Sequence, residues 1–325
     1  MNRLSKLLAA LKIDTYILLL FGMVVLASVL PVHGVAAGAL SWVVKLAIGL
    51  LFFLHGAKLS REAVVAGLTH WRLHLTILAF TFVLFPLLGL GVARSGLLSP
   101  TLSMGMLYLS CLPSTVQSSI AFTSIGRGNV AAAVCAASAS NLLGIFLTPV
   151  LVGLLMNAHG QTGGWESIRS IVMQLLVPFV AGQLARPWVG AWIERHKTLV
   201  GRVDRGSILL VVYAAFSAAV VGGIWNNVSA LELALLIAVC CGLLAVIMAA
   251  TVFGARALGF SKPDEVAIVF CGSKKSLATG VPMAGILFPG ATAGVLVLPL
   301  MIFHQIQLMV CSVIAQRYGA RVEED

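Results

Sequence analysis

Long apolar runs dominate this sequence and leave few architectures open to it. A helix rises about 1.5 Å per residue, so roughly 20 apolar residues cross a hydrocarbon core of about 30 Å. Only 10% of the 325 residues are charged, too few to cover a soluble domain of this size. We therefore predict an all-α polytopic membrane protein with one transmembrane domain over residues 1–325. Its ten expected transmembrane helices span about 14–31, 40–57, 73–93, 101–124, 129–155, 168–186, 207–224, 231–254, 265–288 and 292–315.

The basic residues indicate how these spans are oriented. If the N-terminus is cytoplasmic, 16 of the 21 Lys and Arg residues fall on the inner side, and only Arg94 and Arg169 lie near the outer surface. Positive charge gathers on the cytoplasmic side of membrane proteins. We therefore expect a multi-pass protein of the bacterial inner membrane with both termini in the cytoplasm. The inner-side residues are Arg3, Lys6, Lys12, Lys58, Arg61, Arg72, Arg127, Arg186, Arg195, Lys197, Arg202, Arg205, Arg256, Lys262, Arg317 and Arg321.

The net charge of +10 does not predict a nucleic-acid partner, because the basic residues are scattered one or two per loop without interleaved aromatics. The six cysteines all fall inside apolar runs, and no Cys/His spacing typical of a metal site occurs. We interpret the cysteines as small residues that pack between helices. The sequence thus predicts the lipid bilayer as a partner, and no metal, cofactor or nucleic acid.

The inner loop Pro187–Gly206 divides the chain near its middle. Five expected spans lie on each side of it, a first repeat over about 14–155 and a second over about 168–315. Because five is odd, the two halves would enter the membrane from opposite sides, so any structural repeat must be inverted in topology.

The fourth expected span is interrupted at Pro113, which lacks a backbone donor and clashes with the preceding helical turn. Unwound backbone at membrane depth is tolerated only where it is buried in protein or lines a water-filled cavity. A simple proline kink is the alternative interpretation of Pro113. Five polar side chains follow within six residues and are candidate site residues: Ser114, Thr115, Gln117, Ser118 and Ser119.

The ninth expected span carries Lys274 and Lys275 about a third to half of the way through, between Ser273 and Ser276. A lysine at the centre of a membrane helix costs roughly 2.5–3.5 kcal/mol on insertion scales. All 11 Asp and Glu residues lie at or beyond the ends of apolar runs, so no carboxylate is expected near the lysines. We therefore expect an anionic substrate or an ion-filled cavity as their partner. The same helix is weakened by Gly272, Gly280 and Pro282.

The two interrupted spans are the fourth member of each half. If they cross at the midplane, their half-helix N-termini direct partial positive charge at one site. Together they predict a transport site for a small-molecule organic anion. In the fifth span, Ser138 and Asn141 could line the same cavity or form interhelical hydrogen bonds. In the tenth span, His304 could relay protons or be a hydrogen-bonded structural residue.

Several motifs resemble one known family. The segments Cys111-Leu-Pro113, Arg127-Gly-Asn-Val-Ala131 and Leu147-Thr-Pro149 resemble the fourth and fifth helices of the bile acid:sodium symporter family. The run Cys271-Gly-Ser-Lys-Lys-Ser-Leu-Ala278 is similar to the SBF-like branch of bacterial symporters. The resemblance covers almost the whole chain in span count and order.

This resemblance implies a secondary transporter with an inverted five-plus-five repeat. A core domain, made of the third to fifth and eighth to tenth spans, would move against a panel domain made of the other four. Family substrates are mostly organic anions such as bile acids, other sterol conjugates or small carboxylates, usually carried with sodium.

The resemblance also implies sodium sites, and there this sequence departs from the family. Sodium needs about six oxygen ligands, by analogy with other hard cations. Here a carboxylate, amides and two hydroxyls are missing, so we predict that the standard sodium sites are not intact. We hypothesise that Lys274 or Lys275 supplies the positive charge that sodium supplies elsewhere, which makes transport proton-coupled or uniport. Without this hypothesis the coupling ion, proton or sodium, stays open. The positions that correspond to the family's ligands are Thr81, Ser118, Ser119, Ala133, Ala137, Val269 and Ser273.

Two other classes of function are alternatives. The first is a channel or a non-transporting membrane component in ion or envelope homeostasis. The second is a membrane enzyme with a Ser–Lys dyad at Ser273 and Lys274. Adjacent residues on a helix point about 100° apart, whereas a dyad needs side chains that face each other, so we predict that the protein is not an enzyme.

Overall fold

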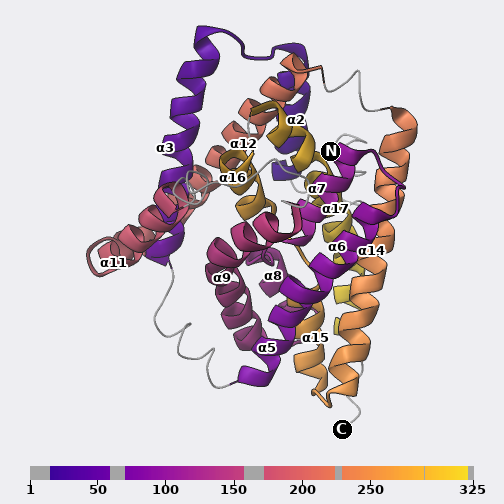
Figure 1. Ribbon diagram of the computed structural model, residues 1–325. Helices are drawn as coiled ribbons and strands as arrows, with labels where there is room; N and C mark the ends of the chain where they lie inside the picture. Colours follow the sequence, from indigo (N-terminus) through magenta and orange to yellow (C-terminus); the bar gives the residue numbers. More distant parts are fainter. Residues whose placement is uncertain (1–14, 59–69, 157–171, 224–228, 289, 321–325) are drawn as a thin grey trace, which may run out of the picture.

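In this computed structural model, which describes residues 15–58, 70–156, 172–223, 229–288 and 290–320, every regular element is a helix (Figure 1). The predicted all-α class is confirmed. The elements are α2 (Thr15–Val29), α3 (Val35–Lys58), α5 (Trp71–Ala79), η1 (Phe80–Leu84), α6 (Phe85–Arg94), α7 (Pro100–Ser110), α8 (Gln117–Ile125), α9 (Val130–Met156), η3 (Val172–Leu176), α11 (Val177–Arg195), α12 (Lys197–Val221), α14 (Ala230–Ala257), α15 (Lys262–Gly272), α16 (Leu277–Leu287) and α17 (Gly290–Gly319).

The elements η1 and η3 are π-helical turns inside longer helical stretches. Both termini and several charges used to predict orientation, among them Arg3, Arg61 and Arg321, lie outside the described residues.

Six helices of the described chain are long and apolar enough to cross a membrane. They fall on six of the ten expected spans, which supports a multi-pass membrane protein. The other four expected spans correspond to shorter or less apolar helices, so the ten-span count and the inverted repeat stay predictions. The six long helices are Val35–Lys58, Trp71–Arg94, Val130–Met156, Lys197–Val221, Ala230–Ala257 and Thr292–Gly319.

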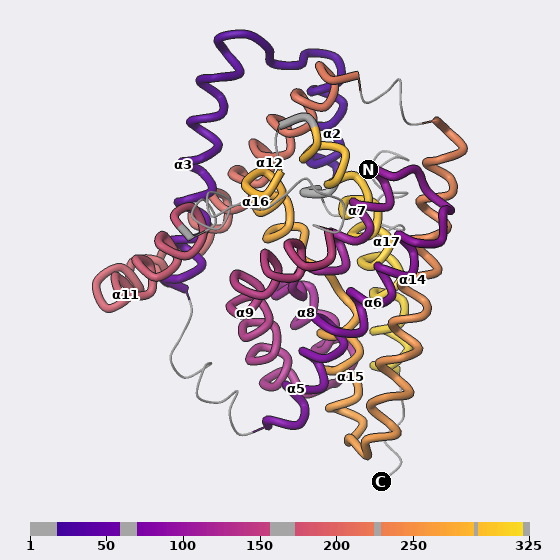
Figure 2. Tube along the Cα trace, in the orientation of Figure 1, coloured from indigo at the N-terminus to yellow at the C-terminus, as the bar shows by residue number. Residues whose placement is uncertain are grey.

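The fourth and ninth expected spans are each split into two helices, as predicted. We call the segment 111–116, between α7 and α8, the first break, and the segment 273–276, between α15 and α16, the second break. In Figures 1 and 2, α7 and α8 lie in the middle of the molecule, α15 extends toward its lower end and α16 lies beside α12.

The helices fall into two groups that meet along α12. Figure 2 shows α3 and α11 on the left, away from α14 and α15 on the right. Helix α12 packs against α2 and α3 on one side and against α16 and α17 on the other. The two breaks therefore belong to the group that contains α14 and α17.

Helices α3 and α11 cross closely because a glycine stands on each side of the crossing. A Cβ atom at Gly56 would lie 2.0 Å from the Phe179 carbonyl oxygen, and one at Gly182 would lie 2.0 Å from the Phe53 carbonyl oxygen. Small residues permit such close backbone contact between membrane helices. Any larger residue at either position would push the two helices apart.

The loop predicted over Pro187–Gly206 is helical except for a turn at His196, so that prediction was wrong. Helix α11 continues to Arg195 and α12 begins at Lys197. Charged residues mark where a chain leaves the membrane. Arg, Lys and Glu also favour the helical conformation, so a run of charged residues does not by itself end a helix.

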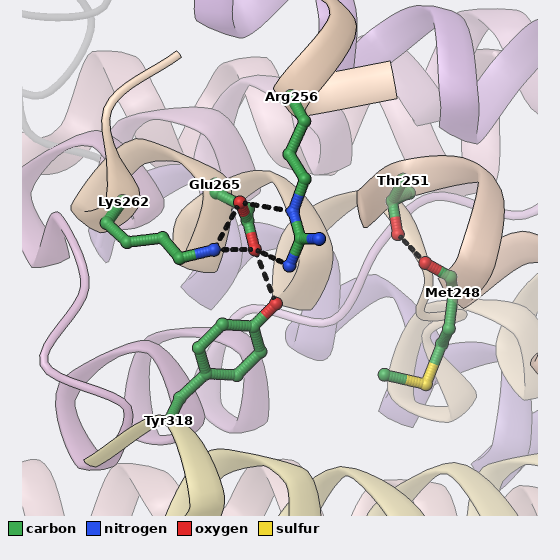
Figure 3. A network of polar contacts seen from close by, with 6 residues as sticks. All are labelled: Met248, Thr251, Arg256, Lys262, Glu265 and Tyr318. Atoms are coloured by element: carbon green, nitrogen blue, oxygen red, sulfur yellow. Dashed lines mark hydrogen bonds and ion pairs between the residues drawn. The ribbon is translucent and has the colours of Figure 1, made fainter. Parts of the chain in front are cut away.

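A buried carboxylate joins α14, α15 and α17 at the end of the molecule near the C-terminus (Figure 3). Glu265 accepts from Arg256 Nε at 3.1 Å, from Lys262 Nζ at 2.8 Å and from the Tyr318 hydroxyl at 2.8 Å. It lies in the first turn of α15, where the helix dipole also favours a negative charge. These contacts anchor the helix that leads into the second break.

The Arg127–Ala131 motif forms the turn between α8 and α9. Asn129 caps α9, because its Oδ1 accepts from Ala132 N at 3.0 Å, and its Nδ2 donates to Asp264 Oδ1 at 2.8 Å. Arg127 adopts a positive φ of 51°, a conformation that the tight turn requires. The motif thus ties the start of α9 to the start of α15.

Candidate functional site

The first break leaves backbone groups without helical partners, because Pro113 has no N–H and the chain unwinds there. Other elements supply the missing partners. The Pro113 carbonyl accepts from Ser276 N at 2.9 Å, and the Ser114 carbonyl accepts from Asn141 Nδ2 at 2.7 Å. Ser114 N donates to Ser140 Oγ at 3.1 Å. The break is therefore a defined structure held by α9 and the second break.

The second break is held mainly by Gln307 of α17. Its side chain accepts from Lys275 N at 3.0 Å and donates to the Lys275 carbonyl at 2.9 Å, replacing two lost helical hydrogen bonds. The side-chain nitrogen of Gln307, Nε2, also lies 2.9 Å from His304 Nδ1. Ser276 then caps α16, since its Oγ accepts from Thr279 N at 3.2 Å.

The two interrupted spans also contact each other through hydroxyl groups of the fourth span. The last carbonyls of α15 have no intrahelical donors because the helix ends there. Ser114 Oγ donates to the Cys271 carbonyl at 2.5 Å, and Ser119 Oγ donates to the Phe270 carbonyl at 2.8 Å. Thr115 Oγ1 in turn lies 2.9 Å from Ser119 Oγ. The predicted crossing of the interrupted spans thus has a direct hydrogen-bonded contact.

Asn141 of α9 connects both breaks. Its Nδ2 is bonded to the Ser114 carbonyl in the first break, and its Oδ1 accepts from Thr279 Oγ1, just after the second, at 2.8 Å. Two carbonyls, those of Ser114 and Ala137, surround Nδ2, which agrees with this orientation of the amide.

Lys275 is completely buried and points into the protein. Its ammonium nitrogen donates to three carbonyl oxygens, of Thr81 at 2.8 Å and of Ser110 and Leu112 at 2.7 Å each. The Phe85 ring lies 4.2 Å away, in cation–π contact. An ammonium has three N–H donors, so every donor of Lys275 has an acceptor.

Lys274 is also completely buried but has a different environment. Its nitrogen donates to the Ser118 carbonyl at 2.9 Å and lies over the Phe122 ring at 4.0 Å and the Phe270 ring at 5.3 Å. Two aromatic faces and one carbonyl are therefore the contacts of this ammonium group.

A cavity of about 530 Å³ lies beside the breaks, within the size range of small-molecule sites. It is lined by side chains from both groups of helices. The predicted site residues that line it are Thr115, Gln117, Ser118, Ser138, Asn141, Ser276 and His304. A second cavity of about 680 Å³ shares Lys58, Gln117, Gly201 and Asp204 with the first.

The other predicted site residues lie behind this lining. Ser114 and Ser119 join the breaks, and Ser273 Oγ donates to the Val269 carbonyl within its own helix at 2.6 Å. Neither lysine lines either cavity. An anion or ion-filled cavity was expected beside the lysines, but the structure surrounds both ammonium groups with carbonyls and rings. A residue pattern does not reveal backbone carbonyls that have lost their helical donors.

Residues of α3 and α12 complete the cavity and were not predicted as site residues. His55 and Lys58 have the same helical face as Leu51, with spacings of three and four residues, and all three line it. From the sequence, Lys58 was counted only among the inner-side basic residues and His55 was not singled out, so their position beside the cavity was missed. The spacing of His55 and Lys58 from Leu51 along α3 is the sequence feature that could have predicted this position. The remaining lining residues from these helices and α11 include Phe52, Phe179, Asp204, Arg205 and Ile208.

The positions that correspond to the family's sodium ligands have other contacts in this chain. Ala133 and Ala137 are fully buried and contribute no side-chain oxygen. Thr81 supplies its carbonyl to Lys275. Among the described residues, no group of three His, Cys, Asp or Glu side chains could hold a metal ion.

Comparison with known proteins gives a consistent result. Residues 14–320 match the model of the SBF-like CPA transporter family. An uncharacterized protein of Pseudomonas aeruginosa is 59% identical over 96% of this chain and 94% of its own length. A protein of Escherichia coli named "Putative symporter YfeH" is 56% identical over 96% of this chain and 95% of its own. Sodium/bile acid cotransporter 7 of Rattus norvegicus is 31% identical over 87% of this chain and 86% of its own.

Proposed function

The chain belongs to the SBF-like CPA transporter family, and on that premise we propose that it carries small organic anions across the bacterial inner membrane. It is a transporter and not an enzyme, in keeping with its family and relatives. Beyond its family and its class as a transporter, we propose the substrate class, the membrane in which it acts and the mechanism. The observation that supports it is the lining of the 530 Å³ cavity.

This lining suits a ligand with an apolar body and a negative group. Its apolar part includes Leu51, Phe52 and Phe179, which can contact a hydrocarbon or ring system. Its charged residues, among the described ones, are Lys58, Arg205 and Asp204, and Lys58 is ion-paired with Asp204. The basic residues exceed the acidic ones, so the cavity attracts an anion more than a cation.

Alternating access supplies the mechanism of the proposal. The cavity lies between the helix group with α3, α11 and α12 and the group that holds the breaks, so a movement of one group against the other would open it to either side. In the proposed topology these are the panel and core domains of an inverted five-plus-five repeat, and both termini are cytoplasmic. The proposal includes standard sodium sites that are not intact, so protons or uniport are its alternatives to sodium coupling.

Counterflow in proteoliposomes tests the proposal. Vesicles loaded with unlabelled taurocholate or benzoate, a sterol conjugate and a small carboxylate, should accumulate the labelled anion transiently when the membrane potential is clamped at zero with equal potassium on both sides and valinomycin. A channel cannot do this once the potential is clamped. Arg205→Gln should lower the initial rate about tenfold, the equivalent of one lost ionic contact. Arg94→Gln, a change of an arginine at the end of α6 outside both cavities, is the matched control. Equal rates for both variants, or no accumulation with a wider set of organic anions, would contradict the proposal.

A further inference from the structure

We propose that the carbonyls of Thr81, Ser110 and Leu112 form a cage for a monovalent cation, and that the Lys275 ammonium occupies this cage as a tethered cation. The inference does not depend on the proposed substrate. It gives one of the two buried lysines singled out from the sequence a defined set of acceptors and a structural role.

The first carbonyl is free because of a proline in the third expected span. In the π-helical turn η1, Phe85 N donates to the Phe80 carbonyl, five residues back. The next residue, Pro86, has no N–H and cannot continue this pattern to Thr81. The Thr81 carbonyl therefore lacks a helical donor and is directed at Lys275 Nζ, 2.8 Å away.

The second and third carbonyls are free because of the first break. The Ser110 carbonyl would accept from residue 113 or 114 in a continuous helix, but Pro113 has no N–H and Ser114 N donates to Ser140 Oγ. The Leu112 carbonyl lies in the unwound segment itself. Both accept from Lys275 Nζ at 2.7 Å.

The arrangement has the properties of a cation site. Three carbonyl oxygens converge on one point from two different expected spans, and backbone carbonyls around a point replace the hydration shell of a monovalent cation in selective pores. The Phe85 ring adds a negative face 4.2 Å away. Thr81 Oγ1 is also buried and has no hydrogen-bond partner among the described residues. The tether holds the cation permanently, so the crossing of the two breaks needs no exchangeable ion.

Lys275→Ala tests the cage directly. The substitution removes three carbons and the ammonium group, the atoms of propylammonium, and leaves a space that a free cation can enter. We expect the thermal unfolding midpoint of the purified variant to fall sharply in N-methylglucamine chloride. Propylammonium, potassium or sodium chloride should restore most of the loss in a saturable manner. The wild-type midpoint should be the same in all four salts.

Two further variants keep the test decisive. Lys275→Met fills the space without a charge, so its midpoint should be low and should not respond to any of these cations. Lys274→Ala removes the neighbouring ammonium, which has a single carbonyl partner, and should show no saturable cation response.

Fluorescence-detected size exclusion of tagged protein from crude membranes gives the same comparison if Lys275→Ala cannot be purified. A wild-type-like midpoint of Lys275→Met would overturn the proposal. So would failure of every cation, propylammonium included, to recover folded Lys275→Ala. Neither result involves transported substrate, so the proposed anion transport is tested separately.

Discussion

The two breaks interrupt their helices in complementary ways. The first, with Pro113 at its centre, presents carbonyl oxygens and hydroxyl groups. The second presents backbone N–H groups and two ammonium groups, on Lys274 and Lys275. A proline creates acceptors by removing a donor, and lysine provides donors only. Because acceptors of the first break bond donors of the second, while α9 and α17 supply the remaining partners, the crossing behaves as one unit and not as two independent defects.

The two adjacent lysines of the second break also differ in their partners. Lys274 and Lys275 are equally buried and both contact aromatic rings, yet Lys274 bonds a single carbonyl and Lys275 bonds three. Their side chains leave the unwound segment in different directions, so the identical residue type meets different parts of the protein. Because Lys275 has the three carbonyl partners, we assign the role of tethered cation to Lys275 and not to Lys274.

The largest effect should come from neutralising the two lysines one at a time. Lys275→Met leaves three buried carbonyls without donors and should lower the free energy of unfolding by roughly 3–5 kcal/mol. Lys274→Met leaves one carbonyl and loses a cation–π contact, and should cost about 2 kcal/mol. Denaturant unfolding in detergent measures both, and Lys45→Met, at an exposed lysine, is the control. Equal losses for both buried lysines would remove the distinction between them.

A smaller effect is expected from the glutamines of α17. Gln307→Leu removes both side-chain hydrogen bonds to the Lys275 backbone and should cost about 2 kcal/mol, because the freed groups stay buried. Gln305→Leu is the matched control, since Gln305 Oε1 is already buried without a partner among the described residues. Its unfolding free energy should change little or rise. A loss as large in Gln305→Leu would show that helix packing, not support of the second break, decides the outcome.

The smallest change in stability should come from Asn141, the residue that connects the breaks. Asn141→Ala loses bonds to Ser114 and Thr279 at the edge of a cavity, where water can replace them, so about 1 kcal/mol is expected. Counterflow should fall more than stability does, because the breaks lose their common link. Ser138→Ala, another cavity-lining change on α9, should affect transport less. Unchanged counterflow in Asn141→Ala would argue against a coupled movement of the breaks.

Much of the candidate site followed from the sequence. Pro113 predicted the first break and the flanking glycines and lysines predicted the second, because both depend on local backbone chemistry. Seven of the twelve predicted site residues line the cavity beside the breaks. The contribution of α3 and α12 was missed, since the residues that line a cavity across a helix interface are set by which faces meet. His55 and Lys58 illustrate this.

The amino-acid sequence alone was enough to predict a helical membrane protein, the places where two helices are interrupted, and carboxylates at or beyond the ends of the apolar runs. The tertiary structure decided what the buried lysines bind. A free carbonyl arises from backbone geometry, here from Pro86 beside a π-helical turn and Pro113 in the first break, and it has no residue type of its own. Only the packing of the third, fourth and ninth expected spans brings three such carbonyls to Lys275.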